Sequence, residues 1–258
     1  MGQNIGILHL SDIHASSSSK TTVQRLVKLL QEDLLEMKKT HNFSVDAICI
    51  TGDLIASGDC AEEELPIVYS DFIQPLLESE NISESKIFVV PGNHEIKRSK
   101  IVDYIETGLS STLTTEYEIA KFMNSPQSYA LERIDYFDKD FGELFGGTII
   151  SSNDFYHSHI LEVKGIKIGI ACINSSWRSS GKGGIEKGKI IIGKQTIIDS
   201  YESISDADIK VCLFHHPLDW LIEEDKSEIE KCINQFNIIL NGHIHEATSK
   251  NLTKTISR

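Results

Sequence analysis

The sequence of 258 residues has few cysteines and no long hydrophobic segment. Its five cysteines are an odd number, and Cys49, Cys172 and Cys212 each lie in an apolar run, where a reduced thiol acts as a small hydrophobic side chain. No run approaches the roughly 18 apolar residues that a membrane-spanning helix needs. The N-terminus carries no signal-peptide pattern, and Gly6 stands where a myristoylation motif has Ser or Thr. We therefore expect a cytoplasmic protein in a reducing compartment, with no membrane partner.

The chain is also short of basic residues. It has 25 Lys and Arg against 38 Asp and Glu, which gives a formal net charge of -13. Long, sequence-independent contact with a nucleic-acid backbone depends on Lys and Arg neutralising phosphates, so this balance argues against it, although a local basic patch remains compatible. With 40% hydrophobic residues the chain can bury a substantial core, as one large α/β domain or two small ones.

Apolar runs of strand length alternate with helical patterns along the chain. Strands are predicted at residues 5–10, 45–51, 87–90, 211–214 and 236–240, and a hairpin at 159–163 and 167–173 turns at Lys164-Gly165. Amphipathic helices are predicted after the serine cluster at 16–19, with Thr21 or Thr22 as N-cap, and at 62–77, 195–201 and 227–233. Strands joined by helices predict an α/β sheet with helical connections.

The segment at 97–155 lacks a clear pattern beyond helices predicted at 116–123 and 134–144. We interpret it as an insertion beside the site, within a single domain at 1–258. It fits a lid or substrate-selecting wall, and a plain connecting excursion equally well.

Polar side chains with metal-binding chemistry follow five of the predicted strands. Because ligands of open α/β sheets bind at the carboxyl ends of strands, we expect these five ends to converge. Carboxylate, imidazole and one amide oxygen suit Mn²⁺, Zn²⁺ or Fe better than Ca²⁺, and seven candidate ligands exceed the needs of one ion. Two ions bridged by Asp53 are therefore predicted. The five ends read Asp12-Ile13-His14, Gly52-Asp53, Asn93-His94, His215 and Gly242-His243-Ile244-His245.

These motifs, from residue 7 to residue 245, resemble the calcineurin-like metallophosphoesterase family, whose pattern is D-x-H, G-D, G-N-H-[D/E], H and G-H-x-H. The resemblance implies an α/β (α+β) fold, a four-layer sandwich of two mixed β-sheets flanked by helices. It implies two divalent metal ions at the strand ends, with Mn²⁺ expected first and Fe, Zn or Ni as alternatives. One ion is then held by Asp12, His14, Asp53 and His245, and the other by Asp53, Asn93, His215 and His243.

The resemblance also implies that His94 is the catalytic residue, protonating the leaving oxygen while a metal-bridging hydroxide attacks phosphorus. The protein-phosphatase branch carries a second Asp three residues after the bridging one and an Arg before Gly-Asn-His, whereas this chain has Ala56 and Pro91. That difference favours the branch of cyclic-nucleotide phosphodiesterases and repair nucleases. We expect a small phosphodiester or nucleotide substrate. A DNA or RNA nuclease module and a non-catalytic metal-binding scaffold are the alternatives.

Several further residues are candidates for substrate binding, metal binding or support of the predicted site. Asn174 and Arg178 follow a strand end and are candidates for substrate binding, and Trp177 could stack on a base or be a buried core residue. His216 competes with His215 as ligand, and Glu95 either orients a neighbour or is solvated.

His157 and His159 are interpreted as structural histidines that could reach a substrate. Thirteen residues follow His245, where family domains add strands. This ending is compatible with a fragment of a longer protein with additional domains, and a homo-oligomer is a further alternative.

Overall fold

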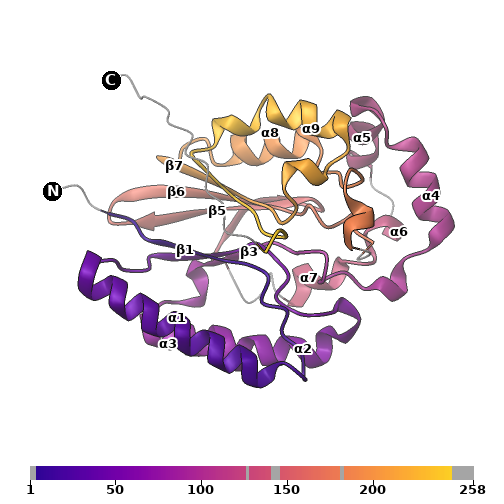
Figure 1. Cartoon of the computed structure of the whole chain (residues 1–258). Coiled ribbons are helices and arrows are strands. Elements are labelled where there is room, and N and C mark those ends of the chain that lie inside the picture. Colours follow the sequence, from indigo (N-terminus) through magenta and orange to yellow (C-terminus); the bar gives the residue numbers. More distant parts are fainter. Residues whose placement is uncertain (1–3, 126–127, 141–145, 181–182, 246–258) are drawn as a thin grey trace.

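Two β-sheets lie face to face between helical layers in the computed structural model, which describes residues 4–125, 128–140, 146–180 and 183–245. Figure 1 shows α1 to α3 covering one side of the sheets and α8 and α9 covering the other. The described chain is therefore an α/β protein with two sheets flanked by helices, in four layers. No helix of these residues is long and apolar enough to cross a membrane.

The smaller sheet has the order β1-β2-β3, with β1 at Ile7–Leu10, β2 at Ala47–Ile50 and β3 at Ile87–Val89. Its described strands are all parallel, so the expectation of two mixed sheets is wrong for this one. The reason lies in the connections, because a helical crossover brings the chain back in the same direction. The crossovers contain α1 at Lys20–His41, α2 at Ala61–Val68, a π-helical turn at Tyr69–Ile73 and α3 at Gln74–Glu80.

The larger sheet has the order β4-β5-β6-β7-β8 and is mixed. Its first three strands are antiparallel and the last two run parallel to β6. The turn between β5 and β6 falls at Lys164 (φ 53°) and Gly165 (φ 77°), as predicted, and positive φ at both residues matches the right-handed twist of a hairpin. The strands are β4 at Ile149–Asn153, β5 at Tyr156–Val163, β6 at Ile166–Ile173, β7 at Ile209–Leu213 and β8 at Ile238–Leu240.

Helices α8 at Lys194–Ser203 and α9 at Glu223–Glu230 cover the outer face of the larger sheet. Helix α9 begins four residues before the predicted start, since acidic residues fill its first turn. The N-cap of α1 is Ser19 rather than Thr21 or Thr22, which lie inside the helix. Short 3₁₀ turns occur at Gly58–Cys60, Glu84–Lys86, Arg98–Lys100, Gly183–Glu186, Leu218–Trp220 and Ile233–Gln235.

Four helices follow the smaller sheet: α4 at Asp103–Thr112, α5 at Glu116–Met123, α6 at Ser128–Leu131 and α7 at Asp135–Asp140. Of these, α5 has the predicted bounds, α4 was not predicted, and the end of the helix predicted at 134–144 lies outside the described residues. The excursion from the sheets ends at β4, before residue 155, because β4 pairs with β5. Leu109, Ile119 and Trp177 help form a separate small core here.

The core between the sheets is built from the inward faces of β2, β3, β6 and β7. Cys49 and Cys172 lie in this layer, while Cys212 faces the layer under α8. All five cysteines are free thiols, in agreement with the odd cysteine count. This packing holds β1, β2 and β3 of one sheet against β7 of the other, and β8 is paired with β7, so that the carboxyl ends of these strands meet.

Candidate metal centre

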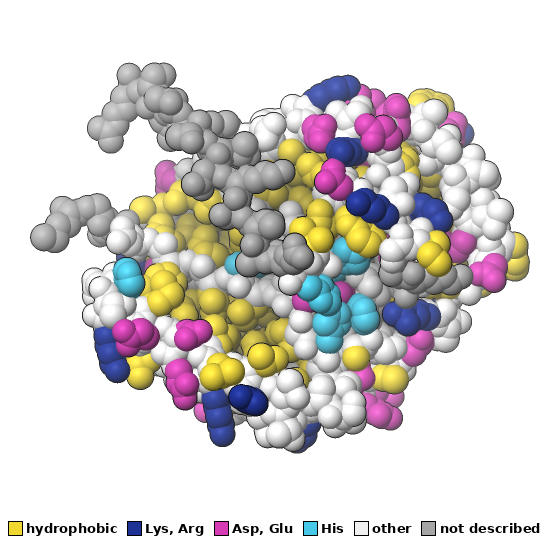
Figure 2. All heavy atoms as spheres, in the orientation of Figure 1, with side chains coloured by type: hydrophobic (Ala, Val, Ile, Leu, Met, Phe, Trp, Pro, Cys, Tyr) yellow, Lys and Arg dark blue, Asp and Glu magenta, His cyan; other side chains and the backbone are white. Residues whose placement is uncertain are grey.

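The predicted ligands gather at the carboxyl ends of the strands, on the face where Figure 2 shows a cluster of histidine side chains. Asp12 and His14 follow β1, Asp53 follows β2, and Asn93 follows β3. The remaining ligands come from the larger sheet: His215 follows β7, and His243 and His245 follow β8. The site therefore bridges the two sheets.

One group of ligands surrounds Asp12. The Nε2 atom of His245 lies 3.4 Å from Asp12 Oδ1 and 3.5 Å from His14 Nε2. His14 Nε2 in turn lies 3.9 Å from Asp53 Oδ2. These side chains are the four that the family resemblance assigns to the first metal ion.

A second group surrounds His215, which is fully buried. Its Nε2 atom lies 3.0 Å from Asn93 Oδ1, 3.0 Å from His243 Nδ1 and 3.3 Å from Asp53 Oδ2. Asp53 Oδ2 therefore faces both groups. This position is the one expected of a carboxylate that bridges two ions.

Backbone conformation sets the direction of these side chains. Among the described non-glycine residues, eight have positive φ, and five of them are predicted ligands: Asp12, His14, Asp53, His243 and His245. Such left-handed residues cost free energy and concentrate at functional sites. The other three, Asn42, Asn81 and Lys164, end helices or form the hairpin turn.

Glu95 holds the turn that carries Asp53. Its buried carboxylate accepts hydrogen bonds from the backbone N–H groups of Gly92 (2.6 Å), Asp53 (2.8 Å), Leu54 (2.7 Å) and Ile55 (3.1 Å). Burial and the nearby Asp53 carboxylate raise the pKa of Glu95 to about 7, against the effect of these donors. Glu95 is therefore a buried residue that orients the Asp53 turn, and not a solvated side chain.

Two glycines let the backbone approach the ligands closely. A Cβ atom on Gly92 would lie 2.1 Å from Asp53 Oδ1, and one on Gly242 would lie 1.9 Å from Ser11 Oγ and 3.0 Å from Asp12 Oδ2. A side chain at Gly92 would therefore displace Asp53, and one at Gly242 would displace Ser11 beside Asp12.

The charges and donors of the site fit divalent ions. Asp12 Oδ1 is buried and has no hydrogen-bond partner among the described residues, which is unfavourable for a carboxylate unless a cation is near. Burial lowers the pKa of His215, but the facing Asp53 carboxylate outweighs it and raises that pKa to about 9. His215 Nδ1 donates to the Thr51 carbonyl (2.6 Å), which leaves Nε2 to face the other ligands. The negative charge that stabilises a proton on the buried His215 ring would also stabilise a metal ion bound in place of that proton.

His94 lies at the edge of this cluster. Its backbone N–H donates to Asp53 Oδ1 (2.8 Å), and its Nδ1 donates to the Ala56 carbonyl (2.7 Å). Its ring lies against that of His14, with centroids 4.4 Å apart. The Nε2 atom is thus free to exchange a proton with a substrate.

Two aromatic residues flank the second group. His216 is fully buried, and its Nδ1 pairs with Ser175 Oγ (3.0 Å), so His215 rather than His216 contacts Asp53 and Asn93. Trp220, which was not singled out in the sequence, lies edge-on to His243 with ring centroids 3.9 Å apart. No local motif marks Trp220, because its place depends on how the 3₁₀ turn after Pro217 folds back onto β8.

The suggested substrate-binding residues lie in other surroundings. Arg178 is buried and pairs with Glu106 (2.7 Å), and Trp177 stacks on Phe122 with centroids 5.6 Å apart. Asn174 Oδ1 accepts from the Ser176 backbone N–H (3.0 Å). Trp177 is therefore a core residue, whereas substrate binding by Asn174 and Arg178 stays a prediction.

Comparison with known sequences identifies the class of protein. The sequence model of the family described as calcineurin-like phosphoesterase matches residues 5–247. Because this match covers nearly the whole chain, the chain belongs to the calcineurin-like phosphoesterase family. The family typically binds divalent metal ions, for which the His and Asp clusters supply ligands.

A curated relative carries a similar description. The chain is 23% identical over 265 residues to the uncharacterized metallophosphoesterase-like protein YydB of Bacillus subtilis (strain 168). That alignment covers 95% of this chain and 49% of the relative, so the chain spans about half the length of the relative.

Proposed function

We propose that the chain is a binuclear metal-dependent phosphodiesterase that hydrolyses a small, nucleotide-like phosphodiester. The observation that carries this proposal is the position of Asp53 Oδ2, 3.9 Å from His14 Nε2 in one ligand group and 3.3 Å from His215 Nε2 in the other. Asp12, His14, Asp53 and His245 would hold one ion, and Asp53, Asn93, His215 and His243 the other. Two bound divalent ions, with Mn²⁺ first, would neutralise phosphate oxygens and lower the pKa of the attacking water.

The protein residues then have distinct tasks. Hydrolysis adds one water across the P–O bond: the water oxygen ends on phosphorus and the leaving oxygen takes a proton. In its imidazolium form His94 supplies that proton from Nε2, because its Nδ1–H is committed to the Ala56 carbonyl. Glu95 keeps the Asp53 turn in place through its backbone hydrogen bonds.

Two positions favour a diesterase over a protein phosphatase. Ala56 and Pro91 stand where the protein-phosphatase branch has Asp and Arg, and both carbonyls are engaged, by His94 Nδ1 and by Ser176 Oγ (2.8 Å) respectively. The charge of -13 also opposes long nucleic-acid substrates. A small diester is therefore the preferred substrate class.

The test is Mn²⁺-dependent hydrolysis of bis-p-nitrophenyl phosphate by the chain as purified. Asp53→Ala and His94→Ala should each reduce turnover at least 100-fold, but only Asp53→Ala should reduce metal content. Full activity of Asp53→Ala, or less than one metal equivalent bound to the parent chain, would refute the proposal. The second result would favour the scaffold alternative.

The substrate class needs a separate assay. Cyclic nucleotides, mononucleotides, plasmid DNA, single-stranded DNA and RNA should be compared at equal phosphate concentration. We expect turnover of the small diesters to exceed cleavage of the polymers, and the opposite order would favour the nuclease alternative. Hydrolysis in ¹⁸O-labelled water should place one labelled oxygen in the phosphate product, whereas a trapped phosphoenzyme would contradict direct attack by water.

A further inference from the structure

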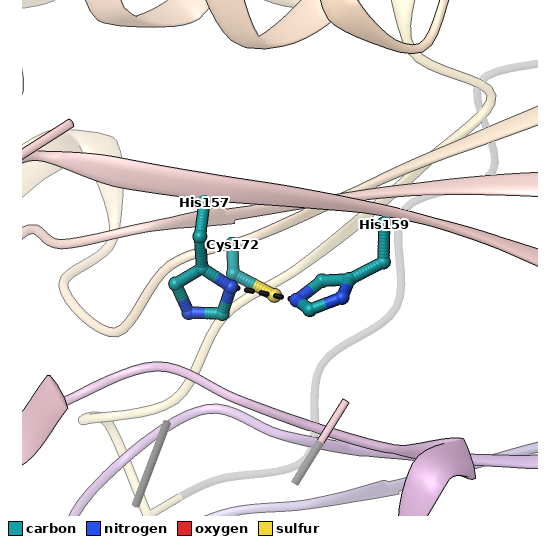
Figure 3. Close-up of side chains that lie close together, drawn as sticks. All are labelled: His157, His159 and Cys172. Atoms are coloured by element: carbon teal, nitrogen blue, oxygen red, sulfur yellow. Dashed lines mark hydrogen bonds between the residues drawn. The ribbon is translucent and has the colours of Figure 1, made fainter. Parts of the chain in front are cut away.

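Outside the centre described above, the described residues contain another cluster of metal-binding side chains. His157 and His159 are two residues apart on β5, so their side chains point to the same face of the sheet. Cys172 on β6 is the direct cross-strand partner of His157. Figure 3 shows the three side chains extending from these strands toward the smaller sheet, with the sulfur beside the two rings. One ligand atom from each lies within 4.8 Å of the others.

The two imidazoles face each other through ring nitrogens. His157 Nδ1 lies 2.7 Å from His159 Nε2. The outer nitrogen of His159, Nδ1, donates to the Thr148 carbonyl (3.3 Å). Burial lowers the pKa of His157 to about 3 and lowers that of His159, so both rings are neutral at neutral pH.

The neutral rings share one proton, because with His159 Nδ1–H directed to Thr148 its Nε2 accepts from His157 Nδ1–H. A cation between the rings would take both facing nitrogens as ligands, and that proton would move to the outer nitrogen of His157. In the binuclear centre two imidazole nitrogens face each other at a similar distance, with His215 Nε2 3.0 Å from His243 Nδ1.

We propose that His157, His159 and Cys172 form a third metal site, for one Zn²⁺ or a similar thiophilic ion, in the core between the two sheets. Two imidazoles and a thiolate are the ligand types that Zn²⁺ prefers over Mg²⁺ or Ca²⁺. A small cavity of about 10 Å³, lined by His157, Cys172, Asp154 and Asn174, adjoins the cluster.

Binding requires small changes in the cluster. Tetrahedral Zn²⁺ with Zn–N bonds of about 2.0–2.1 Å holds its nitrogens roughly 3.3 Å apart, so the rings must separate by several tenths of an ångström. Burial raises the pKa of the Cys172 thiol well above its usual range, so binding must release its proton. Zinc affinity at this site should therefore increase with pH.

The ion would tie β5 and β6 together opposite β3. His159 already contacts the smaller sheet, since its ring lies edge-on to Phe88 with centroids 5.2 Å apart. β3 leads directly to Asn93 of the binuclear centre. The third site is thus a structural clamp behind that centre, and its existence does not depend on the substrate proposed above.

Cobalt substitution tests this site separately from the binuclear centre. No predicted ligand of the binuclear centre is a cysteine, so a thiolate-to-Co²⁺ charge-transfer band in the near ultraviolet reports the third site alone. We expect the band in the metal-free chain titrated with Co²⁺ and its loss in Cys172→Ser. It should persist in Cys232→Ser, a buried-thiol control, and in Cys60→Ser, which removes the exposed thiol.

The outcomes separate the two proposals. Absence of the band in the parent chain, or its survival in Cys172→Ser, overturns the third site. If Cys172→Ser does not fold, X-ray absorption of the zinc-loaded parent chain decides: a sulfur neighbour at about 2.3 Å, averaged with the N and O shells of zinc in the binuclear centre, is expected, and a shell of only N and O overturns the third site. Asp53→Ala should keep the band, and a band without diesterase activity would contradict only the proposed function.

Discussion

Replacing Gly92 by Ala is a direct test of the geometry of the metal centre. The added Cβ would lie 2.1 Å from Asp53 Oδ1 and 2.5 Å from the Asp53 backbone nitrogen. Ordinary contacts to carbon are about 3.5 Å, so the two segments must separate by roughly 1 Å. The carboxylate cannot rotate away alone, because the backbone nitrogen is also blocked. Asp53 must therefore move with its whole turn.

A displacement of that size should affect both ions. Misplacing a catalytic group by about 1 Å costs on the order of 100-fold in rate, which corresponds to about 2.7 kcal/mol. Gly108→Ala is the matched control, because its Cβ would meet nothing within 4 Å. Gly108 lies inside α4, where Ala is favoured over Gly by about 0.5–1 kcal/mol, so this change should stabilise the chain slightly.

The assay is Mn²⁺ affinity by titration calorimetry together with Mn²⁺-dependent hydrolysis of bis-p-nitrophenyl phosphate. Gly92→Ala should lose about 100-fold in the rate constant kcat/KM and bind the metal more weakly, with unchanged secondary structure by circular dichroism. Gly108→Ala should match the parent chain in both. Parental affinity and rate in Gly92→Ala would refute the role assigned to the close approach of Gly92 and Asp53.

Three other perturbations test the surroundings of the site. In Glu95→Gln the side-chain NH₂ group must face two of the four backbone N–H donors, so metal affinity should fall about 10-fold or more. The control Glu64→Gln should leave metal affinity nearly unchanged, because a single oxygen of Glu64 accepts both of its hydrogen bonds. Equal metal affinities of the two variants in calorimetry would contradict this role of Glu95. Burial raises the pKa of Asp225 from 3.8 to about 6. The folded state therefore binds that proton more tightly, and about 3 kcal/mol of stability should be lost as pH rises from 4 through 6. Urea unfolding should show a smaller loss in Asp225→Asn, whose amide oxygen can keep both backbone donors, and an identical pH profile would be the contrary result. Removing metal with EDTA should lower Tm, and Mn²⁺ should restore it; a Tm insensitive to both would argue against bound ions.

The sequence was sufficient to predict that the candidate ligands lie together at the carboxyl ends of the strands. Apolar runs located the strands, and the polar residues at their ends had to meet once those strands packed in parallel. The resemblance supplied the order of the motifs and the division into two ligand groups. The hairpin turn at Lys164-Gly165 was predictable for a local reason, since a two-residue loop needs residues that tolerate positive φ.

Other features depend on contacts between distant segments. Glu95 meets the Asp53 turn across 42 positions, and Trp177 is buried against Phe122 from α5. The guanidinium of Arg178, a predicted substrate-binding residue, is buried against Glu106 of α4, a helix that the periodicity does not reveal. In each case the sequence gives the residue type but not its partner, because no local pattern encodes a contact between segments that are far apart in the chain.

The left-handed conformations of the ligands connect the fold to the chemistry. Five ligands with positive φ cost roughly 1–2 kcal/mol each, which a domain of ordinary stability cannot leave uncompensated. Part of the compensation is internal: the N–H groups of Asp12 and His14 bond the carbonyls of Gly52 (3.1 Å) and Asp53 (2.9 Å), so the strained turns support each other. The remainder falls to Glu95, whose carboxylate holds the Asp53 turn, and to the divalent ions proposed for the site. Metal binding should therefore stabilise the strand ends more than the rest of the fold, and hydrogen exchange should slow most at the amides of Asp12, His14 and Asp53 when Mn²⁺ is added.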